Sequence, residues 1–278
     1  MTNGIPAESW SFDETVLAVV AVFGGLFVVT RTVGTMWAAM RFRCGETIGA
    51  TFAGAQAAGG LIILGALAGG AAREVRESPG YVAMLLGVGM VWMSLVSGLL
   101  AVTGVNLRVH GVERNNFAAV PAWSGAVLGG ALCYAGGSIG EGPAMWENIF
   151  CAGVATLAMM AAWLILEIGA GISASITIER DMASGLRGGG FLMAAGMIAG
   201  RAVAGDWESV DGTLADFAHD AWVLLPLALV AVVVERTLRP SRANPRGKVI
   251  LQGLVPGLGC VAVAAMWIFK LGKWTWHL

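Results

Sequence analysis

Long apolar segments recur along the whole chain, and they constrain its fold more than any other feature of the sequence. A membrane-spanning helix needs about 20 mostly apolar residues. Eight segments of about this length lie at residues 15–37, 47–70, 81–105, 117–138, 148–172, 183–204, 219–237 and 249–269. The chain is 57% apolar and only 13% charged, whereas about 25% of the residues in an ordinary soluble domain are charged. The sequence therefore predicts an all-α polytopic membrane helix bundle with about eight transmembrane helices, and its first expected partner is the lipid bilayer.

The composition also argues against several other classes of protein. The 17 basic residues nearly cancel the 18 acidic ones, so we expect no nucleic-acid partner. Four cysteines in 278 residues are too few for a disulfide scaffold. No motif combines a nucleophile with a base, and no His and Cys spacing is typical of a metal site. We therefore expect a protein that is not an enzyme, with no catalytic residues, no metal and no cofactor.

The basic residues predict how the chain is oriented. With the N-terminus outside, the five basic residues of the outer side are Arg73, Arg76, Arg201, Lys270 and Lys273. The twelve of the inner side are Arg31, Arg41, Arg43, Arg108, Arg114, Arg180, Arg187, Arg236, Arg239, Arg242, Arg246 and Lys248. This excess follows the positive-inside rule, so both termini are predicted outside. Residues 1–14 contain no Lys or Arg, so we also expect no cleaved signal peptide.

A pattern of small residues recurs in every second apolar segment. Four polar residues precede these segments, namely Glu46, Asn116, Asp181 and Asn244. Nine and thirteen residues after each of them lie the small residues Ala55, Gly59, Gly125, Gly129, Gly190, Ala194, Gly253 and Gly257. Small residues four positions apart share a helix face and allow another backbone to approach closely.

The recurrence predicts four tandem hairpin repeats in parallel orientation. The small-residue helices would form the centre of the bundle, and bulkier segments such as 81–105 would face lipid. We place two membrane units at residues 1–140 and 141–278, each with two helical-hairpin repeats. The alternative remains open that Gly and Ala are simply common in membrane helices.

Two stretches resemble a known family. Residues 114–130 read RNNFAAVPAWSGAVLGG, and residues 179–196 read ERDMASGLRGGGFLMAAG. The Asn-x-Ala-Ala start followed by spaced glycines resembles the YjfL-like bacterial inner-membrane proteins, an uncharacterised transmembrane family also called domain of unknown function 350. Members usually have four spans in two such halves. The resemblance implies a duplicated unit in a bacterial inner (plasma) membrane and implies no biochemical activity. Glu46 and Asp181 depart from the Asn of the motif.

Two ionisable residues inside the predicted spans are candidates for a functional site. Glu167 lies in ILEIGAG of the fifth span, and Arg187 lies in GLRGGG of the sixth. Charges within a membrane are costly and mark a site with a partner. The two spans are consecutive and antiparallel, so we expect Glu167 and Arg187 to form a pair at similar depth. The alternative is that both side chains extend to the lipid headgroups.

The polar residues at the helix starts have two interpretations. They cap free backbone N–H groups, or they converge as a polar ring around a cytoplasmic vestibule. Likewise, Gln56 and Gln252 either form hydrogen bonds between helices or line a pathway.

The sequence is compatible with two functions. The first is a non-enzymatic membrane subunit in assembly, partner regulation or envelope stress, with a homo-oligomer or other membrane subunits as partners. The alternative is an ion or small-solute channel or transporter.

Overall fold

The described part of the chain is entirely helical apart from turns and one isolated bridge. The computed structural model describes residues 45–142, 145–239 and 248–272, together with scattered positions between 15 and 34. The bridge joins Ala71 and Gly140. The all-α fold predicted from the sequence is confirmed for these residues. Most of the first predicted segment lies outside them.

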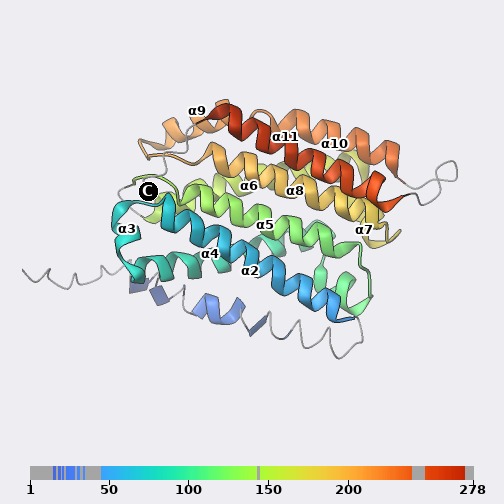
Figure 1. The fold of residues 1–278 in the computed structure, drawn as a ribbon, viewed down its shortest axis with the longest axis horizontal. Helices are drawn as coiled ribbons and strands as arrows, with labels where there is room; N and C mark the ends of the chain where they lie inside the picture. Colours follow the sequence, from blue (N-terminus) through green and yellow to red (C-terminus); the bar gives the residue numbers. More distant parts are fainter. Residues whose placement is uncertain are drawn as a thin grey trace, which may run out of the picture.

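Four helices lie side by side and form the body of the molecule (Figure 1). They are α2 (Gly45–Gly69), α5 (Ala119–Gly137), α8 (Met182–Ala202) and α11 (Val255–Leu271). Phe52 stacks on Trp123 with ring centroids 4.7 Å apart, and further along the same helices a Cβ at Gly59 would lie 3.3 Å from Ala131. Contacts thus advance in the same direction along α2 and α5, so the two helices are parallel.

Three more long helices pack against this row. The first, α4 (Pro79–Val102), contacts α2 and α5, while α6 (Met145–Ala170) contacts α5 and α8, and α10 (Leu224–Leu238) contacts α6 and α8. The short elements are α3 (Arg73–Glu77), α7 (Ile172–Thr177), α9 (Val210–Ala221) and two π-helical turns, η1 (Leu107–Glu113) and η2 (Ile250–Leu254). Wide turns of this kind occur frequently at functional sites.

The small residues of the sequence pattern lie at very close helix crossings. A Cβ added to Gly125 would lie 2.0 Å from the carbonyl oxygen of Gly189, and one added to Gly190 would lie 2.5 Å from Cα of Gly257. The backbones of α5 and α8, and of α8 and α11, therefore touch without side chains between them. The remaining positions of the pattern, namely Ala55, Gly59, Gly129, Ala194 and Gly253, are buried.

The helices that are most buried are not all those that the repeats predict. In the most apolar part of Ile250–Leu271 only 11% of the residues are buried, against 50% in α6. We expected the small-residue helices to be central and the bulkier ones to face lipid. The centre is instead formed by α5 and α8, because α11 lies at one edge of the row and packs mainly against α8, through the side that carries Gly257 and, in η2, Gly253.

Four described helices are long and apolar enough to cross a membrane, namely Ile48–Gly69 of α2, α4, α6 and Ile250–Leu271. A fifth is the pair α9 and α10, which is bent by 40°. Helices α5 and α8 are long enough but not apolar enough to be counted with them, because glycine, serine and, in α8, arginine lower their mean hydropathy. For the described residues, length and hydropathy thus support a multi-pass membrane protein with four or five spans, fewer than the eight expected.

Candidate functional site

Arg187 lies at the centre of a buried charge cluster near the start of α8. Its side chain is 5% exposed, and its Nε donates to Oε2 of Glu235 on α10 over 2.6 Å. Glu235 is 1% exposed. Asp181 is the N-terminal cap of α8, and its Oδ2 lies 3.6 Å from Nη2 of Arg187. The cluster therefore brings one guanidinium and two carboxylates into the protein interior.

The other nitrogens of Arg187 also have acceptors. Nη2 donates to Oγ of Ser184 over 2.9 Å, and Nη1 donates to the backbone oxygen of Gln252. This oxygen is available because Pro256, four residues later, has no N–H to donate to it. The side chain of Arg187 thus joins α8 to α10 and to the wide turn η2.

Ser184 connects the two carboxylates. Its Oγ lies 2.6 Å from Oε1 of Glu235 and 2.7 Å from Oδ2 of Asp181, and it can donate its one proton to only one of them at a time. Asp181 also accepts from the backbone N–H groups of Ala183 (3.3 Å) and Ser184 (2.9 Å). Asp181 therefore has the capping role that was one of its two interpretations.

The expected pair of Glu167 with Arg187 is wrong. Both carboxylate oxygens of Glu167 accept from Ser173 instead, Oε2 from its backbone N–H over 2.8 Å and Oε1 from its hydroxyl over 2.6 Å. The chain turns at Gly171, whose φ is +61°, and returns Ser173 to the end of α6. Glu167 thus stabilises the start of α7, while Arg187 extends toward α10 and η2.

Sequence reasoning missed Glu235, although a signal was present. Glu235 lies inside the predicted span 219–237, where an ionisable residue requires a partner as much as Arg187 does. Glu167 and Arg187 lie on consecutive helices, whereas the true partner of Arg187 is 48 residues away in the chain. The pairing depends on how α10 packs against α8, and no local pattern specifies that contact.

Among the three other polar residues at helix starts, the structure describes the side chain of Asn116 alone. Asn116 is 2% exposed, donates through Nδ2 to the backbone oxygen of Ile176 over 2.7 Å, and accepts through Oδ1 from the N–H of Ala118 over 3.0 Å. Asn244 and the side chain of Glu46 lie outside the described residues. A ring of all four residues therefore stays a prediction.

A second ion pair lies at the end of α10, beyond the buried cluster. Arg239 donates to Glu179 through Nε over 3.2 Å and also through Nη2. The hydrogen bond to Glu179 raises the pKa of the Arg239 guanidinium, which therefore remains charged. Arg239 also donates to the backbone oxygen of Ala170 over 3.4 Å. This pair ties the end of α10 to the connection between α6 and α8.

An apolar pocket of about 240 Å³ between α10 and α11 ends at the charge cluster. Its walls include Leu227, Val230 and Val263, and Arg187 and Glu235 lie at its polar end. Because each nitrogen of Arg187 already has a protein acceptor, the cluster is arranged to hold helices together. Among the described residues, no group of three or more His, Cys, Asp or Glu could hold a metal ion.

Comparisons with family models, with curated proteins and with solved structures find no match to this chain. The resemblance to the YjfL-like proteins therefore stays a prediction from residues 114–130 and 179–196.

Proposed function

We propose that this protein is a non-enzymatic subunit of a bacterial inner membrane, with eight spans and both termini on the outer side. The position of α5 and α8 supports the higher number of spans. Both lie between α2 and α11 in one row. At 1.5 Å per residue, their 19 and 21 residues extend over about 30 Å, the thickness of the hydrocarbon core.

The contacts between helices support four tandem repeats. Gly125, nine residues after Asn116, meets Gly189, eight residues after Asp181. Gly190, nine residues after Asp181, meets Gly257, thirteen residues after Asn244, so small residues of neighbouring copies lie against one another, with an offset of about one helical turn at the second crossing. Such contacts are expected for parallel repeats that are related by an axis along the membrane normal. Successive small-residue helices would then all begin on the inner side of the membrane.

The observation that carries the choice of a subunit is the complete pairing of Arg187. Charges inside the membrane often mark a substrate or ion pathway, where a solute can reach them. Arg187 instead donates to Glu235, Ser184 and Gln252 at once, which fixes α8, α10 and η2 relative to one another. A rigid bundle of this kind suits a role in assembly, partner regulation or envelope stress.

The outer face of α11 is the surface that we assign to a partner subunit. It carries large exposed side chains, among them Leu258 (57%), Met266 (65%) and Phe269 (90%). A photo-cross-linking amino acid at Leu258 or Met266 is expected to give a discrete protein adduct in cells. The same amino acid at Ala264, which is fully buried, is the matched control and is expected to give none. Lipid adducts alone at Leu258 and Met266 would contradict the subunit role.

The pocket beside Arg187 and Glu235 favours the second candidate, a channel or transporter for ions or small solutes. Liposomes that contain the purified protein distinguish the two functions. The subunit proposal predicts ion flux no higher than in empty liposomes. Flux that requires the protein and changes in Glu235→Gln would instead support the transporter.

A further inference from the structure

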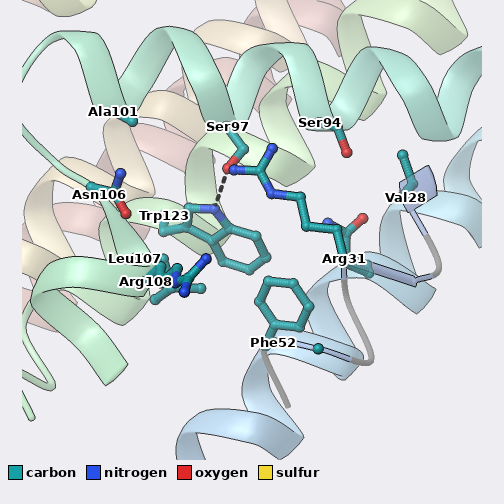
Figure 2. A pocket seen from close by; sticks show the side chains of 12 residues that line it. Val28, Arg31, Phe52, Ser94, Ser97, Ala101, Asn106, Leu107, Arg108 and Trp123 are labelled. Carbon is teal, nitrogen blue, oxygen red and sulfur yellow. Dashed lines mark hydrogen bonds between the residues drawn. The ribbon is translucent and has the colours of Figure 1, made fainter. Parts of the chain in front are cut away.

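A second pocket, of about 280 Å³, opens near the start of α2, where α2, α4, η1 and the first segment meet (Figure 2). Its floor is aromatic and well fixed. Trp123 is 1% exposed, stacks on Phe52, and donates through Nε1 to Oγ of Ser97 over 2.8 Å. The floor therefore presents ring faces and a hydroxyl group in a rigid arrangement.

The walls of the pocket are basic. Arg31 and Arg108 both line it, and in Figure 2 the side chain of Arg31 extends toward Ser97 and Trp123. No Asp or Glu is among the described residues that line it. Arg108 contacts Glu113 at 3.4 Å, but its side chain is 72% exposed, so this pair is weak and open to exchange. Two guanidinium groups beside hydroxyl and amide groups form a site for a phosphate group.

Gln56 gives an independent indication of a ligand. Its side chain is 7% exposed and lines the pocket. Its Oε1 is buried and has no hydrogen-bond partner within the described part of the chain. Buried polar atoms are almost always satisfied, and each exception requires an explanation. A ligand that donates an O–H or N–H group would supply the missing partner.

The wide turn η1 supports the rim of the pocket. Asn106 lines the pocket and begins η1, and its Oδ1 accepts from the N–H of Val109 over 3.2 Å. The backbone N–H of Asn106 donates to Nδ1 of His110 over 3.1 Å. Burial, reinforced by the charge of Arg114, lowers the pKa of His110, which keeps this nitrogen free to accept. Arg108 therefore lies in a turn that hydrogen bonds of Asn106 to Val109 and His110 stabilise.

We propose that this pocket binds a phosphate ester that carries a neighbouring hydroxyl group. Arg31 and Arg108 hold the phosphate, Gln56 accepts from the hydroxyl, and the ring of Trp123 forms the floor. The ligand is the phosphoglycerol headgroup of a membrane lipid or the same chemical group free in solution. This inference is independent of the role as a subunit, because it involves neither Arg187 nor the face of α11.

The test measures binding of glycerol phosphate and of methyl phosphate to the purified full-length protein by calorimetry. Methyl phosphate has the phosphate but lacks the hydroxyl donor. We expect glycerol phosphate to bind at least ten times more tightly, and Gln56→Leu to remove this preference. Arg108→Gln is expected to weaken both ligands at least tenfold. Arg73→Gln is the matched control, because Arg73 is a paired, exposed arginine far from the pocket, and it should leave binding unchanged.

A second arm of the experiment distinguishes the two sources of the phosphate group. Native mass spectrometry compares retention of phosphatidylglycerol with that of phosphatidylcholine. Retention of phosphatidylglycerol that is lost in Arg108→Gln, without binding of free glycerol phosphate, identifies the lipid headgroup as the ligand. Binding of free glycerol phosphate identifies the soluble ester. No binding in either arm, or binding that is unchanged in both Gln56→Leu and Arg108→Gln, would overturn the proposal. Because Arg108 is exposed, its variant tests the site even if Gln56→Leu does not fold.

Discussion

Arg187→Met is expected to destabilise the protein by about 3–5 kcal/mol, because the carboxylates of Glu235 and Asp181 would remain buried without their cation. Glu235 is 1% exposed, so water does not replace the lost partner. The measurement is the midpoint of unfolding of the purified protein in mixed micelles with increasing SDS. Arg236→Met is the matched control, because Arg236 is the exposed next residue on α10. Its loss is expected to change stability by less than about 0.5 kcal/mol.

The double variant Arg187→Met/Glu235→Leu shows whether the loss comes from the pair itself. Replacing both members of the pair with apolar groups of similar volume removes the charge of Glu235, and such exchanges are often neutral or stabilising. Asp181 stays charged, but its carboxylate keeps the hydrogen bonds from the backbone N–H groups of Ala183 and Ser184. We therefore expect the double variant to recover much of the stability that Arg187→Met loses, a coupling that independent sites do not show. Additive losses, or an Arg187→Met protein as stable as Arg236→Met, would refute a stabilising ion pair between Arg187 and Glu235.

Gly125→Ala is expected to destabilise the protein by about 1–3 kcal/mol, at the upper end of this range, through overpacking. The added methyl would lie 2.0 Å from the backbone oxygen of Gly189, so α5 and α8 would have to separate. Gly125→Val should prevent folding. Gly153→Ala on α6 is the control, because no atom lies within 4 Å of its added Cβ. That control is expected to stabilise by about 0.5–1 kcal/mol, since alanine is the better helix former.

The same unfolding assay measures the glycine variants. Opposite signs for Gly125→Ala and Gly153→Ala would establish that the backbones of α5 and α8 touch in the membrane protein. A stabilising effect of Gly125→Ala would contradict the tight crossing, because it would place Gly125 in open space like Gly153.

The helix positions could be predicted closely from the sequence. The segment 47–70 corresponds to Gly45–Gly69, and 81–105 corresponds to Pro79–Val102, because apolar runs in this chain end at glycine, proline or charged residues. The small residues at helix crossings were also predictable, since Gly125 and Gly190 recur at a fixed spacing. The break between α9 and α10 was not expected, because the run of 219–237 is continuous in hydropathy.

The site residues were harder to predict because they depend on tertiary contacts. Arg187 was singled out correctly as a buried charge, but its partner is on α10 and not on the preceding helix. Pro256 marked a carbonyl oxygen that lacks a helical partner, and this signal pointed to Gln252 without pointing to Arg187. Gln56 was expected either to bond between helices or to line a pathway, and it lines a pocket. The rest of this pocket gave no local signal, since its lining comes from separate helices.

The most direct test is whether α8 crosses the membrane, since it contains Arg187 and is one of the two helices, with α5, that hydropathy alone does not support. Single cysteines at Ile178 and Glu208, which are exposed before and after α8, would be placed in a chain whose four own cysteines are alanine. Intact cells would then be treated with a membrane-impermeant maleimide. We predict labelling at position 208 in intact cells, and labelling at position 178 only after the membrane is opened. Labelling of both positions from the same side would contradict a transmembrane α8.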